Sequence, residues 1–161
     1  MEILDQFIKS RSHSRIGQSS IIFFSLFNIS NRIATDIDNS LSDLTLKQLL
    51  LLIAVEIIQG GSYTELGNIM GSSRQNIKNL AIALEKKGYV SIIPDPNDSR
   101  AFKVISTERT KDHFEEMDLL YSKKLVELFS AFSDDEVAQL FALFDKFFQG
   151  VEVMERSNEN F

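Results

Sequence analysis

Apolar residues recur at helical spacing along most of the chain and follow a strand-like pattern in one short region. Helical periodicity, read with start and stop signals, predicts six helices over residues 17–36, 46–59, 63–70, 73–87, 107–131 and 133–156. Two β-branched or aromatic runs, Tyr89–Ile93 and Phe102–Ile105, flank a loop that holds both prolines, and they predict a hairpin. The expected fold is mainly α (α+β), with the order α-α-α-α-β-β-α-α.

Capping-box spacing supports three of these helix starts. In such a box an N-cap hydroxyl accepts from the N3 amide, while the N3 side chain accepts from the N-cap amide. The chain has a hydroxyl residue three positions before Gln or Glu at Thr45–Gln48, Ser72–Gln75 and Ser133–Glu136.

The third and fourth helices, joined by a turn at Gly71, have the pattern of a helix-turn-helix. The fourth helix places its apolar residues on one face, which we expect to pack inward: Ile77, Leu80, Ala81 and Leu84. Its opposite side and flanks carry Arg74, Gln75, Asn76 and Lys78 and no acidic residue before Glu85. Such side chains can contact guanine and adenine edges in the major groove. An ordinary amphipathic helix explains the pattern equally well.

The expected hairpin loop, residues 94–101, adds a second DNA-binding feature. Its prolines stiffen a projecting tip, and Arg100 on such a tip can enter a narrow minor groove. Asp98 is expected to pair with Arg100 and orient its guanidinium. The alternative is a surface ion pair that contributes little.

Together these segments resemble the MarR family of winged-helix regulators. The resemblance covers about residues 17–155 and rests on Leu44-Thr45-x-x-Gln48, Glu65-Leu66-Gly67, Ser73-Arg74-Gln75-Asn76-Ile77, Leu84-Glu85-Lys86-Lys87-Gly88-Tyr89-Val90 and Asp95-Pro96-Asn97-Asp98-Ser99-Arg100-Ala101. It implies one subunit over residues 1–161, with a winged DNA-binding lobe at 44–106 and dimerisation helices at 17–36 and 107–156. It also implies a homodimer on a pseudo-palindromic double-stranded operator.

The same resemblance implies roles for individual residues. Ser73, Arg74, Gln75, Asn76 and Lys78 match the groove-facing start of the recognition helix, Arg100 matches the wing arginine, and Asp98 matches its supporting aspartate. Release by a small aromatic or amphipathic effector is a further family-level expectation, for which no residue can be singled out.

Two departures from the family pattern stand out. Residues 106–110 lack the glycine that often follows the second wing strand, and Gly67 stands where alanine is usual. We expect Gly67 to loosen its short helix by up to about 1 kcal/mol relative to alanine.

The terminal helices carry more apolar surface than one neighbouring helix can cover. The segment Val137–Phe148 is apolar around most of its circumference, and the region Ile21–Phe27 has the same excess. Left exposed, such surface would aggregate, so we expect the two regions to interdigitate with a second copy. The alternative is a monomer in which the first and last helices cover each other.

Composition and charge modify this picture. The net charge is −6, which alone would argue against nucleic acid. Residues 72–112, however, hold 8 basic and 5 acidic groups, whereas residues 113–161 hold 4 and 11. The positive stretch coincides with the helix and wing expected to contact phosphate.

The remaining chemistry is defined mainly by what the chain lacks. It has no Cys and two histidines, His13 and His113, which we expect to be solvated, so no thiolate, metal or cofactor site is predicted. Neither an enzyme motif nor an apolar run long enough to span a bilayer occurs. We expect a cytoplasmic regulator, more readily a repressor because a dimer on an operator blocks polymerase. The alternative is a winged-helix protein-interaction module.

Overall fold

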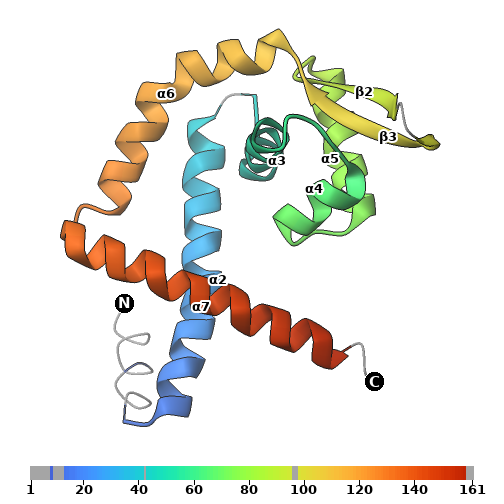
Figure 1. Ribbon diagram of the computed structural model, residues 1–161. Coiled ribbons are helices and arrows are strands. Elements are labelled where there is room, and N and C mark those ends of the chain that lie inside the picture. Colours follow the sequence, from blue (N-terminus) through green and yellow to red (C-terminus); the bar gives the residue numbers. More distant parts are fainter. Residues whose placement is uncertain (1–7, 9–12, 42, 96–97, 159–161) are drawn as a thin grey trace. The chain divides into compact units, whose positions relative to one another are not determined.

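The computed structural model describes residues 8, 13–41, 43–95 and 98–158, without the side chains of 98–100 and 158. Its elements are α2 (Arg15–Ser40), α3 (Leu46–Ile57), β1 (Gly61–Ser62), α4 (Tyr63–Met70), α5 (Arg74–Lys86), β2 (Val90–Asp95), β3 (Asp98–Ser106), α6 (Glu108–Leu128) and α7 (Asp134–Asn158) (Figure 1). The predicted mainly α fold with one hairpin is confirmed. Periodicity missed β1, which at two residues is too short to show a pattern.

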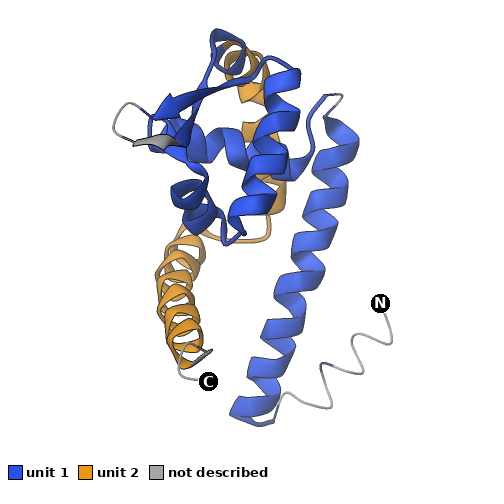
Figure 2. Cartoon of the chain, turned by 90° about the vertical axis from the view of Figure 1, so that its right-hand side faces the viewer, with its two compact units in different colours: residues 1–111 blue, residues 112–161 orange. Residues whose placement is uncertain are grey.

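The chain divides into two compact units, residues 1–111 and 112–161, shown in blue and orange in Figure 2. The first unit contains α2 to β3 and the first turn of α6, and the second contains the rest of α6 and α7. The lobe expected at 44–106 lies within the first unit. Its DNA-binding role, and the dimerisation role of the terminal helices, stay predictions.

The core of the first unit forms where α3, α4 and α5 meet the sheet (Figure 1). Its fully buried side chains include Leu51, Leu52, Val55, Leu66, Ile77, Leu84 and Val104. The expected inward face of α5 is confirmed, with Leu80 half-buried and the other three residues buried. This lobe therefore covers its main apolar faces within its own fold.

The sheet is antiparallel, with strand order β1-β3-β2. Its hairpin strands are longer than predicted, since Pro94 pairs with Phe102 and Asp95 with Asp98. The expected loop over residues 94–101 is therefore wrong. Pro94 is tolerated because β2 is an edge strand, where a missing N–H need not break the ladder, and the register shifts directly after it.

Capping residues set the helix starts, with one correction to the prediction. The boxes at Thr45–Gln48 and Ser133–Glu136 are present, and Ser62–Glu65 forms a further box that the analysis missed. At α5 the predicted Ser72–Gln75 box is wrong, because Ser73 is the N-cap and its Oγ accepts from the Asn76 amide at 3.3 Å. Hydrogen bonds from Ser62 lower the pKa of the Glu65 carboxyl.

Gly67 allows the turn between α4 and α5 to fold tightly against α4. Its carbonyl accepts from the Ser72 amide at 2.9 Å, and Gly71 ends α4 in the left-handed conformation with φ of 58°. A Cβ at Gly67 would lie 2.6 Å from the Ser72 carbonyl oxygen. The structure thus gives a packing reason for glycine at this position.

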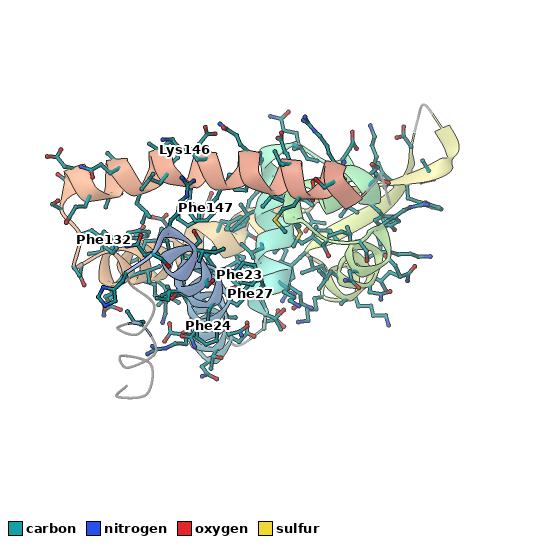
Figure 3. All side chains as sticks on the ribbon, turned by 90° about the horizontal axis from the view of Figure 1, so that it is seen from below. Phe23, Phe24, Phe27, Phe132, Lys146 and Phe147 are labelled. Atoms are coloured by element: carbon teal, nitrogen blue, oxygen red, sulfur yellow. The ribbon has the colours of Figure 1, made fainter. Side chains whose placement is uncertain are left out.

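Long helices α2 and α7 carry large apolar side chains outward. Figure 3 labels Phe23, Phe24 and Phe27 on α2, which are 60%, 48% and 59% exposed. Among the described residues of α2, Gly17 is the buried one. The described side chains of α7 are all exposed apart from half-buried Leu140.

Candidate nucleic-acid interface

The start of α5 presents the side chains expected to read DNA. Ser73, Arg74, Gln75, Asn76 and Lys78 are all exposed. Because the Ser73 hydroxyl caps the helix, it also fixes the first turn that carries the other four. The sequence prediction of their position on the outward face is therefore met, while their contact with DNA stays a prediction.

A side-chain hydrogen bond organises the middle of this face. The Gln75 Nε2 donates to the Asn79 Oδ1 at 3.1 Å, one helical turn along. This bond leaves the Gln75 carbonyl oxygen and its second N–H available, and an adenine edge requires one acceptor and one donor of this kind.

An open groove of about 580 Å³ runs beside α5 toward the hairpin. Arg74, Gln75 and Lys78 supply its polar lining, and its apolar and aromatic lining consists of Ile82, Ile92, Phe102 and Tyr63. Ile82 of α5 is half-buried here. The groove thus combines two cations with an apolar surface, which suits a sugar-phosphate backbone beside a base edge.

Tyr63 is a groove residue that the sequence analysis missed. It is 6% exposed, and burial, followed by the nearby Glu85 carboxylate, raises the pKa of its hydroxyl. The hydroxyl therefore stays protonated at neutral pH and can donate. Tyr63 is the first residue of α4 and reaches the groove only through the packing of α4 against α5, so no local sequence signal marks it.

Helix α5 is tied directly to the hairpin. Glu85, near the end of α5, accepts from the Ile92 amide of β2 through its Oε1 at 2.8 Å. On the sheet, Lys103 lies 3.8 Å from the Asp95 carboxylate. The first contact therefore joins α5 to β2, and the second joins the two strands of the hairpin.

Asp98 and Arg100 occupy the first residues of β3, because the hairpin strands are extended. Arg100 is therefore on a strand and not in a loop, close to the Asp95–Asp98 pair that closes the ladder. The side chains of both residues lie outside the described part of the structure. Their predicted ion pair consequently stays a prediction.

The two units differ strongly in charge. Residues 1–111 contain 13 basic and 11 acidic side chains, whereas residues 112–161 contain 4 and 12. The unit that holds α5 and the hairpin is therefore positive by two charges, and the other is negative by eight. A DNA duplex would be attracted to the first unit and repelled by the second.

The histidines and carboxylates do not gather into a metal site within the residues that the structure describes. His13 is exposed as expected, but His113 is half-buried on α6, with its Nε2 2.9 Å from the Tyr121 hydroxyl. The expectation that His113 is solvated is therefore wrong, because Tyr121, eight residues further along the same helix, contacts its ring. None of the described helices is both long and apolar enough to cross a membrane.

Comparison with known proteins gives one curated relative and many similar structures. The relative, YcgE of Bacillus subtilis (strain 168), is an uncharacterised HTH-type transcriptional regulator, 28% identical over 95 residues. The match spans 59% of this chain and 60% of that protein, which is less than two thirds of its length. No family model matches the chain.

Three solved structures illustrate the similarity. A MarR protein from Peptoclostridium difficile is 21% identical, with a TM-score of 0.76 over 83% of this chain and 88% of that one. A mutant MarR from E. coli complexed with operator DNA is 25% identical, with a TM-score of 0.70 over 83% and 99%. Bordetella bronchiseptica BpsR, whose DNA binding is regulated by 6-hydroxynicotinic acid, is 18% identical, with a TM-score of 0.70 over 78% and 97%.

Proposed function

We propose that this chain, which has the fold of MarR-family regulators as its motifs predict, is a sequence-specific DNA-binding regulator of transcription. The observation that carries the proposal is the exposed start of the capped helix α5, beside a groove that Arg74 and Lys78 line with positive charge. Gln75 and Asn76 are exposed on the same turn. The E. coli MarR structure with operator DNA supports it by analogy of fold.

In this proposal α5 enters the major groove and the hairpin contacts the adjacent minor groove. Arg74 and Lys78 supply the cations for phosphate or guanine, and Gln75, oriented by Asn79, reads an adenine edge. Arg100 reaches the minor groove from the start of β3, with Asp98 as its support. Ser73 caps the start of α5, and this helix start binds the nearest phosphate.

Two copies of the chain bind one pseudo-palindromic operator. The exposed apolar faces of α2 and α7 support this part of the proposal, because a second copy would cover them. Such a dimer would block polymerase on its operator, so repression is the simplest regulatory outcome. A small aromatic or amphipathic effector would release it, as 6-hydroxynicotinic acid regulates BpsR.

Selection of bound sites from a random duplex pool tests the proposal with the full chain. We expect enrichment of an inverted repeat whose half-sites lie about one helical turn apart, roughly 34–36 Å. Equal binding of all duplexes would contradict the proposal and favour the protein-interaction alternative.

Substitutions then assign the contacts. Arg74→Ala and Gln75→Ala should each lower the ratio of affinities for selected and random DNA by about 10-fold. Arg100→Ala should weaken binding to the selected duplex and reduce the salt slope by about one, with the dimer intact. Lys146→Ala, which removes one exposed cation from α7, is the matched control. Unchanged affinity and salt slope for Arg100→Ala would refute the wing assignment.

A further inference from the structure

Asp43, in the link between α2 and α3, is contacted by side chains from distant parts of the first unit. Its Oδ2 accepts from the Tyr89 hydroxyl at 2.9 Å and from the Arg109 guanidinium at 3.1 Å. The same guanidinium lies over the Tyr89 ring, with its central carbon 4.7 Å from the ring centroid. One carboxylate thus joins the residue that precedes β2 to the first turn of α6.

Lys87 adds the end of the recognition helix to this group. It is the C-cap residue of α5, and its Nζ donates to the Asp43 carbonyl oxygen and to the Gln48 Oε1, the latter at 3.1 Å. The Nζ also lies 3.9 Å from the Asp43 Oδ1. We name Asp43, Gln48, Lys87, Tyr89 and Arg109 the Asp43 cluster.

The backbone carbonyl of Tyr89 also takes part in several hydrogen bonds. Its carbonyl oxygen accepts from the Thr107 amide at 3.0 Å, from the Thr107 hydroxyl at 2.9 Å and from the hydroxyl of fully buried Thr110. Threonines at the start of α6 thereby fix this helix to the start of the hairpin. Thr110 stands at the position where the family pattern often has glycine, and its hydroxyl makes this contact.

Both connections between the lobe and the long helices pass through this region. The end of α2 is tied to the start of α3, since Asp38 Oδ1 accepts from the Leu46 amide. The start of α6 is tied through Arg109 and the two threonines. The cluster therefore lies where α2 and α6 join the lobe that carries α5, the helix proposed to enter the major groove.

We propose that Asp43, with Tyr89 and Arg109, is a positioning group that sets the half-site spacing which the DNA-bound dimer accepts. This inference rests on the proposed function. The three residues touch no base, so they act through the angle between α5 and the helices that join the two copies. Because Asp43 and Arg109 are half-exposed, at 43% and 57% of their side-chain surface, their ion pair adds little to stability. Spacing selectivity and stability should therefore separate on mutation.

The experiment compares duplexes that carry the selected inverted repeat with duplexes that have one base pair added or removed between the half-sites. One base pair displaces a half-site by about 3.4 Å and rotates it by about 34–36°. The measured quantity is the ratio of dissociation constants for altered and selected spacing, obtained by fluorescence anisotropy, together with the melting temperature of each variant.

Asp43→Asn and Tyr89→Phe should lower this ratio by about 3- to 10-fold while the melting temperature changes little. Tyr89→Phe alters no charge and keeps the ring beneath Arg109, so it decides the matter if Asp43→Asn fails to fold. Lys123→Gln, which removes a cation paired at i,i+4 on α6, should leave the ratio unchanged. The extra charge difference in Asp43→Asn affects all duplexes alike and cancels in the ratio.

A ratio equal to that of the wild-type chain in the folded variants would overturn the inference, whether or not the melting temperature falls. A lower melting temperature with an unchanged ratio would make the cluster a structural contact only. If the wild-type chain selects no sequence at all, the proposed function itself fails. A wild-type chain with a clear spacing preference that both variants retain contradicts this inference alone.

Discussion

The winged lobe has a core of fully buried apolar side chains, whereas many of the large apolar side chains of α2 and α7 are exposed. Leu66, Ile77 and Val104 have no exposed surface, while Phe141 on α7 is 80% exposed and Phe148 is 68% exposed. Composition differs as well, since the lobe at residues 44–106 contains a single phenylalanine, Phe102, whereas α2 and α7 together contain seven. The difference is that the helices and the sheet of the lobe pack on one another around a shared core. The exposed apolar side chains of α2 and α7 fit the second copy of the chain that we propose.

Charge differs between the two compact units, with α2 on the side of the lobe. The unit with the lobe is positive by two charges, and the unit with α7 is negative by eight. The acidic total therefore conceals a unit of net positive charge, as the proposed DNA binding requires, beside a strongly negative one. The low positive charge of the lobe also predicts modest affinity for random DNA, so specificity must depend on a few contacts.

Truncating the lobe core should give the largest loss of stability. Leu66→Ala, at a fully buried position of α4, should lower the free energy of unfolding by about 2–5 kcal/mol, because it leaves a cavity. Ile69→Ala on the same helix removes a half-exposed side chain and should change it by less than about 0.5 kcal/mol. Urea denaturation measures both. Equal effects at the two sites would remove the distinction between covered and uncovered positions.

A charge on the exposed face of α7 should disrupt assembly without unfolding the lobe. Phe141→Glu should weaken dimerisation by about 2 kcal/mol or more, because it would bury an unpaired carboxylate between copies. Sedimentation at micromolar concentration would show a shift toward monomer, and far-UV circular dichroism would be unchanged. Gln139→Glu adds the same charge at an exposed polar position of α7. A Phe141→Glu variant that assembles like the wild-type chain would contradict the role assigned to this face.

Gly67→Ala should destabilise the lobe despite the better helix propensity of alanine. The new methyl group would meet the Ser72 carbonyl oxygen at 2.6 Å, and such overpacking costs about 1–3 kcal/mol. The propensity gain is at most about 1 kcal/mol. The melting temperature should therefore fall, and selected-DNA affinity should fall with it because the start of α5 moves. A higher melting temperature would contradict the packing argument.

The capping box of α4 should give a small, pH-dependent effect. Hydrogen bonds from Ser62 lower the pKa of Glu65 in the folded chain. A lowered pKa stabilises the fold above the unfolded value of about 4.3, and this contribution disappears as the pH falls through the folded value. The melting temperature of Glu65→Gln should therefore lie below that of the wild-type chain at pH 7, and the difference should shrink as the pH falls below the unfolded pKa. A melting-temperature difference that does not change with pH would contradict the stabilising role of the ionised Glu65. Glu115→Gln serves as the control for loss of an exposed carboxylate.

The order of helices and strands was predictable because each element carries a local signal. Periodicity placed Ile77, Ala81 and Leu84 inward, and Thr45 with Gln48 marked the start of α3 correctly. The outward position of Arg74 and Lys78 follows from the same periodicity. These are properties of single helices, which a sequence records directly.

Features that depend on pairing between distant segments were not predictable. The hairpin is longer than expected because Pro94 finds a partner in Phe102, and no local signal shows that an edge strand will tolerate it. Asp43 and Arg109 are 66 positions apart, so nothing in the sequence links them. Tyr63 and Phe102 likewise join the groove through the fold alone.

The most direct test of the central claim is the stoichiometry of the chain on its selected duplex. Sedimentation equilibrium at micromolar concentration should show two chains of 18.3 kDa on one duplex with an inverted repeat, each presenting one α5 to a half-site. A complex with a single chain per duplex would contradict the account. Absence of any complex with duplex DNA would contradict it more completely, because both the lobe and the long helices would then need another explanation.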